Sequence, residues 1–120
     1  MANNKAREVR SGEFSELLGE GNPLLVDFYA TWCGPCKVME PIVERLAERF
    51  AGRAAVVKVN IDNSPDLAAA YGVRSVPTLL LLESGRVVER TVGTSSEQSL
   101  AVLIEKYAAN SEAIDEATAA

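Results

Sequence analysis

Two cysteines separated by Gly and Pro are the residues of this chain whose types and spacing could do chemistry. The segment Ala30–Lys37 reads ATWCGPCK and holds both cysteines, Cys33 and Cys36, with a Trp directly before them. Two thiols at this spacing could form a redox pair, contribute to a metal site, or be inert core residues. The chain has no His and no third Cys, so a zinc or iron–sulfur site could form only if it were shared between subunits.

A helix must begin at these cysteines. An apolar face that repeats every four residues predicts a helix over Gly34–Phe50, with Pro41 inside it. Cys33 then lies at the helix N-terminus, and Cys36 lies about one turn in on the same face. Because free N–H groups at a helix N-terminus stabilise an anion, we expect Cys33 to be the attacking thiolate and Cys36 to act second. Pro35 is tolerated there because first-turn N–H groups have no helical partner.

The remaining patterns predict a single domain with the element order β-α-β-α-β-α-β-β-α. The expected elements are a strand near Ala6–Val9, a helix over Gly12–Leu18 capped by Ser11, a strand over Leu24–Ala30, the helix over Gly34–Phe50, a strand over Ala54–Asp62, a short helix from Pro65 to Tyr71 capped by Ser64, two strands around the turn Ser84–Gly85, and a helix over Ser96–Ala108. The near-continuous apolar run Leu24–Ala30 is typical of a strand covered on both faces. We expect residues 1–108 to form the domain and the Ala- and Glu-rich tail, residues 109–120, to fray or be disordered.

The composition and charge of the chain argue against several classes of function. The chain has 120 residues, of which 48% are hydrophobic and 24% charged, and its formal net charge is −5. That charge, without a basic cluster, argues against binding to nucleic acid or to an anionic membrane, and no apolar run reaches the ~20 residues of a membrane span. The polar N-terminus has no secretory h-region, so we expect a cytoplasmic protein. A purely structural disulfide is not expected in that compartment.

The segment VDFYATWCGPCK closely resembles the active-site segment of the thioredoxins. Four further matches follow in the right order: Pro41, VKVNID at residues 57–62, YGVRSVPT at residues 71–78 and VGT at residues 92–94. The resemblance covers about Val9 to Ala108. It implies the α/β thioredoxin fold, in which four helices flank a central five-stranded mixed sheet and the dithiol lies at the carboxyl end of a central strand.

Two charged residues in apolar strands are candidates for proton handling. Asp27 interrupts the run LLVDFYA and could be an ordinary strand-edge carboxylate, but burial in such a strand would raise its pKa. The resemblance implies that Asp27 lies behind Cys36 and helps to deprotonate it. Lys58, in VVKVN, could be an exposed strand end. The resemblance places it near Asp27, where its charge would oppose the effect of burial.

The resemblance also implies a docking surface for substrates. It makes Pro77 a cis-proline in a loop that faces the dithiol, and Val76 the source of backbone groups that pair with an extended substrate segment. Gly93 and Trp32 match the flat apolar surface around the dithiol, although Trp32 could equally belong to the core. We also expect a monomer, since nothing in the sequence beyond this docking surface suggests a dimer. The sequence departs mildly from the family at Tyr29, where many members carry a second Trp, and at Ser75, where Gly is frequent.

Together these features imply a general protein-disulfide reductase whose product is a Cys33–Cys36 disulfide. The resemblance suggests recycling by thioredoxin reductase, an NADPH-linked flavoprotein. The chain itself has no nucleotide motif, and we expect no bound cofactor and no metal. Gly34 and Pro35 between the cysteines favour reduction, because a His there would stabilise the thiolate further and make the pair more oxidising. The alternatives are a thiol oxidase or disulfide isomerase with the same fold, and a binding module that does not use its thiols.

Overall fold

The computed structural model describes residues 6–18 and 21–119. Its elements follow the expected order: β1 (Arg7–Glu8), α1 (Ser11–Leu17), β2 (Leu24–Tyr29), α2 (Gly34–Arg49), β3 (Ala55–Asn60), α3 (Pro65–Ala70), β4 (Thr78–Glu83), β5 (Arg86–Val92) and α4 (Glu97–Ala119). The predicted bounds agree within one or two residues for every element except the last helix. Within the described residues, none of the helices combines the length and the apolar character that crossing a bilayer requires.

The five strands form one mixed sheet in the order β1-β3-β2-β4-β5. β3 pairs in parallel with β1 and with β2, whereas β4 is antiparallel to β2 and to β5. β2 is therefore a central strand, and its residues from Leu24 to Phe28 are all buried. This burial on both faces explains why its sequence is almost continuously apolar.

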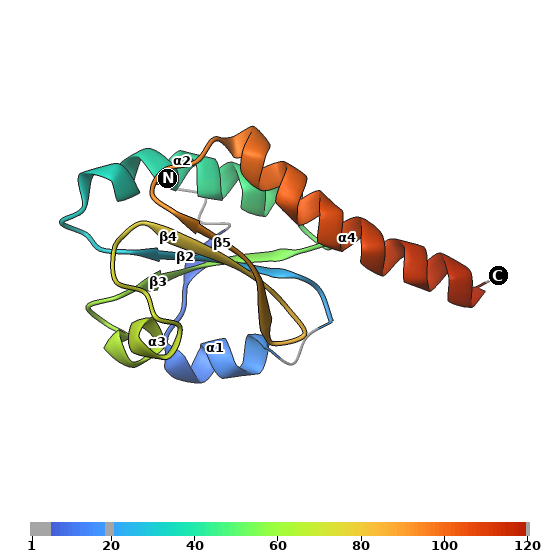
Figure 1. Cartoon of the computed structure of the whole chain (residues 1–120), viewed down its shortest axis with the longest axis horizontal. Helices are drawn as coiled ribbons and strands as arrows, with labels where there is room; N and C mark the ends of the chain where they lie inside the picture. The colour runs from blue at the N-terminus through green and yellow to red at the C-terminus, as the bar shows by residue number, and fades with distance from the viewer. Residues whose placement is uncertain (1–5, 19–20, 120) are drawn as a thin grey trace.

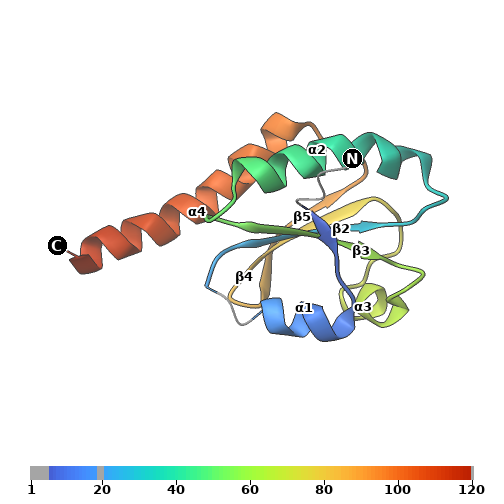
Figure 2. The same ribbon diagram turned by 180° about the vertical axis from the view of Figure 1, so that it is seen from behind.

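Helices cover both faces of the sheet (Figures 1 and 2). α2 and α4 lie on one face and α1 and α3 on the other. Alternate residues of β2 divide between the two cores, because successive side chains of a strand point to opposite faces. Leu25 packs with Met39 and Val43 of α2, whereas Val26 and Phe28 pack on the opposite face.

Local signals explain where the elements begin and end. Pro65 opens α3 directly after Ser64, as expected of a residue whose missing N–H costs nothing in the first turn. Ser84 and Gly85 both have positive φ, 54° and 80°, which the tight turn between β4 and β5 requires. The expected cap Ser11 was wrong: Arg10 is the N-cap of α1, and the Ser11 hydroxyl instead donates to Asp66.

The last helix is longer than expected. α4 runs from Glu97 to Ala119 rather than ending at Ala108, and it projects beyond the sheet (Figure 1). Residues 109–119 are rich in Ala and Glu, which are strong helix formers, and contain no Gly or Pro to interrupt the helix. The expectations that this tail frays and that the domain ends at residue 108 stay predictions.

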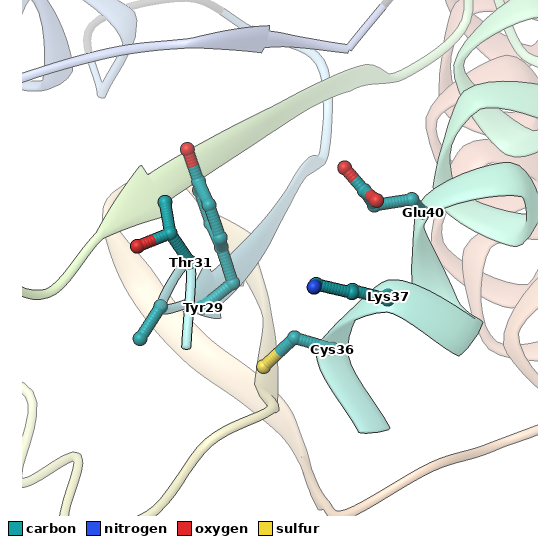
Figure 3. A pocket seen from close by; sticks show the side chains of 6 residues that line it. Tyr29, Thr31, Cys36, Lys37 and Glu40 are labelled. Atoms are coloured by element: carbon teal, nitrogen blue, oxygen red, sulfur yellow. The ribbon is translucent and has the colours of Figure 1, made fainter. Parts of the chain in front are cut away.

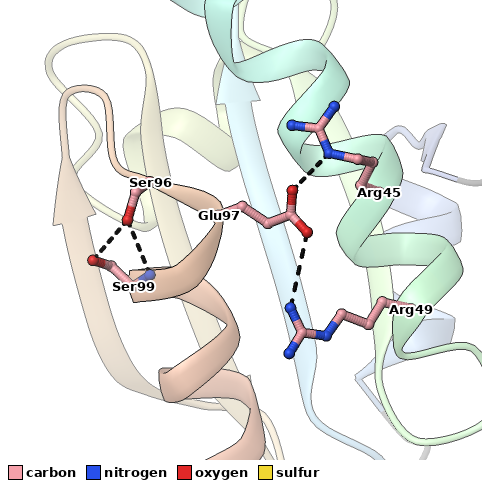
Figure 4. A network of polar contacts seen from close by, with 5 residues as sticks. All are labelled: Arg45, Arg49, Ser96, Glu97 and Ser99. Carbon is pink, nitrogen blue, oxygen red and sulfur yellow. Dashed lines mark hydrogen bonds and ion pairs between the residues drawn. The ribbon is translucent and has the colours of Figure 1, made fainter.

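Ion pairs join the start of α4 to α2 (Figure 4). Glu97 Oε1 lies 2.6 Å from Arg45 Nε, and Glu97 Oε2 lies 3.8 Å from Arg49 Nη1. Ser96 precedes the helix, and its Oγ accepts a hydrogen bond from the Ser99 N–H at 3.1 Å, as an N-cap side chain does. The position of α4 is thus set by polar contacts at its first turn and by the apolar core below.

Candidate active site

The cysteines lie after the end of β2, at the start of α2. Cys33 is the N-cap of α2, with extended backbone (φ −92°, ψ 114°), and Cys36 lies in the first turn. The two are joined as a disulfide with their Cα atoms 5.3 Å apart. The Cys36 N–H donates to Cys33 Sγ at 3.1 Å, so a free N–H group of the helix already points at the sulfur on which a thiolate would develop. Both side chains are buried, Cys33 at 5% exposure and Cys36 at 2%.

A proline loop approaches the disulfide from the other side of the site. The carbonyl oxygen of Val76 lies 3.7 Å from Cys33 Sγ, and the bond between Val76 and Pro77 is cis, as the resemblance implies. The Gly93 N–H donates to the Pro77 carbonyl at 2.8 Å, with Gly93 at φ 91°, so the segment after β5 abuts this loop. Pro77 itself is buried, whereas Val76 and Gly93 are partly exposed.

Trp32 is displayed on the surface rather than packed in the core. Its side chain is 68% exposed, and its indole Nε1 donates to Asp62 Oδ2 at 3.0 Å. A side-chain contact supports Asp62 in turn, because its own N–H donates to Asn60 Oδ1 at 2.9 Å. The indole is thus held by a directional hydrogen bond, and its apolar face remains open next to the disulfide.

Asp27 is buried under α2. It is 1% exposed, and its Oδ1 has no hydrogen-bond partner among the described residues. Burial raises the pKa of Asp27 to about 7, the nearby Lys58 cation opposes this effect, and the Glu40 carboxylate adds to it. Glu40 follows Cys36 by four residues on α2, so it lies one helical turn from the resolving cysteine. Asp27 can therefore gain or lose a proton close to neutral pH.

Lys58 is the direct neighbour of Asp27 across the pairing of β2 with β3. Its Nζ lies 3.6 Å from Glu44 Oε2, and both side chains are largely buried, at 16% and 26% exposure. The same Nζ lies 5.9 Å from the centroid of the Tyr29 ring. The cation therefore has an acidic partner on α2 and an aromatic partner on β2 in addition to Asp27.

A cavity of about 170 Å³ opens beside Cys36. Its lining comes from the end of β2 and the first turns of α2, and it consists of Tyr29, Ala30, Thr31, Cys36, Lys37 and Glu40. Figure 3 shows Tyr29 and Thr31 on one side and Cys36, Lys37 and Glu40 on the other. This volume is large enough for several water molecules, so the cavity offers a route between solvent and the resolving sulfur.

The fold brings the residues singled out from the sequence into two groups. Cys33, Val76, Pro77 and Gly93 meet at the exposed end of α2, beside Trp32. Asp27 and Lys58 lie side by side beneath that helix. Gly34 and Pro35 are exposed in its first turn. Within the described residues, no group of three or more His, Cys, Asp or Glu side chains is arranged to hold a metal ion.

Several partners of these residues were not identified from the sequence. They are Asp62, which holds Trp32, Glu40, which acts on Asp27, Glu44, which pairs with Lys58, and Glu8, which accepts a hydrogen bond from Tyr29. The one available signal was helical spacing, which places Glu40 and Glu44 on the same face of α2. The others depend on contacts between distant segments.

Comparison with known proteins agrees with this geometry. Residues 5–106 match the family model named Thioredoxin, a range that contains the cysteine pair, Asp27 and the proline loop. The chain is 41% identical over 103 residues to thioredoxin 1 from Nostoc sp., which covers 85% of this chain and 96% of that protein. It is 43% identical over 89 residues to the M-type chloroplastic thioredoxin of Zea mays, covering 74% of this chain and 53% of that protein.

A solved structure shows the same fold. A mutant thioredoxin from Halobacterium salinarum NRC-1 superimposes with a TM-score of 0.79 at 44% sequence identity, over 90% of this chain and 96% of that chain. At this level of identity the similarity extends beyond the arrangement of the helices and strands to the sequence itself.

Proposed function

Because the chain belongs to the thioredoxin family and is a protein-disulfide oxidoreductase with a Cys33–Cys36 redox pair, we propose that Cys33 is the attacking thiolate and Cys36 the resolving thiol of a general protein-disulfide reductase. The observation that carries this assignment is the position of Cys33 Sγ. It accepts a first-turn N–H of α2, that of Cys36, at 3.1 Å and faces the Val76 carbonyl at 3.7 Å.

The first half of the reaction takes place on the exposed side. A substrate segment docks against Trp32, Val76 and Gly93, and the backbone groups of Val76 pair with it in an extended form. The Cys33 thiolate attacks one sulfur of the substrate disulfide. A bond forms between Cys33 and that sulfur, the substrate S–S bond breaks, and the other substrate sulfur leaves as a thiolate that takes a proton.

The second half depends on the buried side. The Cys36 thiol gives its proton to the Asp27 carboxylate, and its sulfur attacks Cys33 Sγ. The Cys33–Cys36 disulfide forms as the bond to the substrate breaks, and the second substrate sulfur leaves as a thiolate that takes a proton from solvent, so the substrate has gained two electrons and two protons. Asp27 suits this role because its pKa of about 7 lets it accept a proton near neutral pH. Lys58 makes the ionised form of Asp27 less costly.

The remaining parts of the proposal concern partners and place. The oxidised pair needs two electrons from outside the chain, and we assign this step to an NADPH-linked flavoprotein, thioredoxin reductase. Disulfide-containing proteins are the substrates. We also propose that the protein works as a monomer in the cytoplasm. Some relatives, such as the one from Zea mays, are chloroplastic. A plastid is therefore the compartment against which the proposed cytoplasmic location should be tested.

The two alternatives predict different behaviour of the thiols. An oxidase or isomerase would keep the same geometry, but its disulfide would be less stable relative to the dithiol. It would therefore transfer the disulfide to its substrates. A binding module would dock partners at the same face and would retain its cellular function when both cysteines are replaced by Ser. The Gly34–Pro35 pair between the cysteines favours the reductase.

The reduction potential of the pair tests the proposal. The protein would be equilibrated in graded dithiol and disulfide buffers, and its free thiols counted by alkylation and mass. A potential well below the glutathione poise is expected, and one well above it would identify an oxidant or isomerase. In parallel, Cys36→Ser should accumulate a mixed disulfide at Cys33, whereas Cys33→Ser should form none. A mixed disulfide at Cys36 instead would reverse the assigned roles.

A further inference from the structure

Tyr29 is a residue at the site to which the reaction described above assigns no role. Its hydroxyl donates to Glu8 Oε1 of β1 at 2.6 Å, a short hydrogen bond of the kind that a charged acceptor makes. The other oxygen of Glu8 accepts from Asn63 Nδ2 at 2.9 Å. Hydrogen bonds from these two residues lower the pKa of Glu8, so its carboxylate is ionised at neutral pH. The tip of the Tyr29 ring is therefore anchored to a fixed charge.

The ring lies near two parts of the site. Tyr29 lines the cavity that Cys36 also lines (Figure 3). The Lys58 ammonium lies 5.9 Å from the ring centroid. Tyr29 and Asp27 are two residues apart on β2, so their side chains leave the strand on the same face, the face that packs against α2. The ring thus lies on the same face of β2 as Asp27, beside the cavity and near the Lys58 cation.

This placement has two consequences for Asp27. The ring lines the cavity beside Cys36, whereas Asp27 does not line it and is 1% exposed, and burial is the largest cause of the raised pKa of Asp27. The ring also attracts the Lys58 cation. This cation therefore interacts with the ring and with Glu44 as well as with Asp27. The other charged group that acts on Asp27 is Glu40 of α2, and the β4 residue opposite Asp27 is the apolar Leu79. Among these groups, Tyr29 can affect both solvent access and the position of Lys58.

We propose that Tyr29, held in place by Glu8, is a positioning residue for the resolving step: its ring keeps water away from Asp27 and holds the Lys58 cation. This inference rests on the proposed role of Asp27. An aromatic residue without a donor at its tip could fill the same space but could not be fixed by the Glu8 carboxylate. The hydroxyl of Tyr29 therefore has a function that a ring of the same size without a hydroxyl would lack.

The substitution Tyr29→Phe tests the proposal because it removes the hydroxyl, retains the ring and changes no charge. In the full-length protein, the carboxyl group of Asp27 would be titrated by NMR in the oxidised state. The rate at which Cys36 resolves a preformed mixed disulfide would be followed against pH. Freeing the ring should admit water to Asp27, and the midpoints of both titrations should fall by about 0.5–1 pH unit.

Two further variants make the test specific. Glu8→Gln, which weakens the same anchor from the other side, should lower the midpoint as well, and the double variant should shift it no more than the larger single change. The matched control is Tyr107→Phe, since Tyr107 of α4 also donates to a glutamate, Glu89 of β5, at 3.0 Å. Both midpoints should stay at the wild-type value in that variant.

Each failure has its own signature. Midpoints for Tyr29→Phe that equal those of the wild type, or that shift as much in Tyr107→Phe, would overturn the role of Tyr29. If Asp27→Asn resolves the mixed disulfide at the wild-type rate, the proposed role of Asp27 fails instead. The NMR titration of Asp27 would still report whether the ring controls its environment.

Discussion

Asp27 and Lys58 are direct neighbours in the parallel pairing of β2 with β3, and both lie beneath the helix that carries the two cysteines. The carboxyl group is almost fully buried and one of its oxygens has no hydrogen-bond partner among the described residues. The ammonium group of Lys58 lowers the pKa of this carboxyl, against the effects of burial and of Glu40. Proton transfer to and from Asp27 is therefore governed by a small set of neighbours, which can be altered one at a time.

Replacing Asp27 by Asn should slow the resolving step. The amide cannot accept the proton of Cys36, so the rate at a pH of about 7.5 should fall about a hundredfold or more, in keeping with the loss of a general base. Because Asp27 ionises around pH 7, we expect the wild-type rate to rise there, and this rise should be absent in the variant. Quenched-flow measurement of mixed-disulfide decay checks both effects. Asp66→Asn, at an exposed position, is the control, and a wild-type rate in Asp27→Asn would remove the base.

The same substitution should change how stability depends on pH. The pKa of Asp27 rises from 3.8 to about 7 on folding. Between these values the folded state holds a proton that the unfolded state releases, so the free energy of unfolding falls as pH rises from about 4 to about 7. The amide of the variant cannot ionise, so Asp27→Asn should be more stable than the wild type above about pH 7 by about 2–4 kcal/mol. Urea unfolding of the oxidised proteins at about pH 5 and about pH 8 measures this, and an equal pH dependence in both would contradict it.

Replacing Lys58 by Met should shift Asp27 in the opposite direction from Tyr29→Phe. Without the ammonium group the ionised carboxyl loses its nearby cation, so the NMR midpoint of Asp27 should rise. Near pH 7 less of the base would be ionised, and resolution should slow. Lys106→Met is the matched control for this substitution, because Lys106 also pairs with a glutamate, Glu89, and lies over a tyrosine ring. A midpoint that stays constant or falls in Lys58→Met would show that Lys58 does not act on Asp27.

Asp62→Ala should loosen the exposed indole of Trp32. The substitution removes the acceptor of the 3.0 Å hydrogen bond from the indole N–H, so the ring should rotate more freely. Trp32 is the only tryptophan of the chain, and time-resolved fluorescence anisotropy reports its motion directly. We expect KM for a protein disulfide to rise about two- to fivefold while a small disulfide reacts unchanged. Equal losses with both substrates would indicate damage to the dithiol rather than to docking.

The contact between α2 and α4 should depend on its apolar part more than on its ion pairs. Glu97 lies between Arg45 and Arg49 (Figure 4), but both arginines are about half exposed. Glu97→Gln should therefore cost about 0–1 kcal/mol, and less at high salt. Leu100→Ala, one turn further along α4 and 1% exposed, should cost about 2–5 kcal/mol. Urea unfolding compares them, and a larger cost for Glu97→Gln would contradict this ranking.

Most of the fold could be predicted because its signals are local. The apolar run of β2, the four-residue periodicity of α2, Pro65 after Ser64, and the turn at Ser84–Gly85 each act within a few residues. The cap of α1 and the end of α4 were predicted less accurately. At Ser11 a contact with the distant Asp66 replaced the expected cap. In α4 the helix continues beyond Ala108, where the apolar face in the sequence ends, because the tail is rich in strong helix formers.

The reacting groups of the site can be read from the sequence: two cysteines three residues apart at a helix start, a carboxyl group in an apolar strand, and a proline loop. The groups that set their properties come from distant segments that meet only in the folded chain. Asp62 meets Trp32 across 30 positions of the chain, and Tyr29 meets Glu8 across 21. Such partners depend on strand order and on how α2 lies over the sheet. Because pKa values and side-chain orientation follow from burial and near neighbours, they are fixed by packing rather than by local sequence.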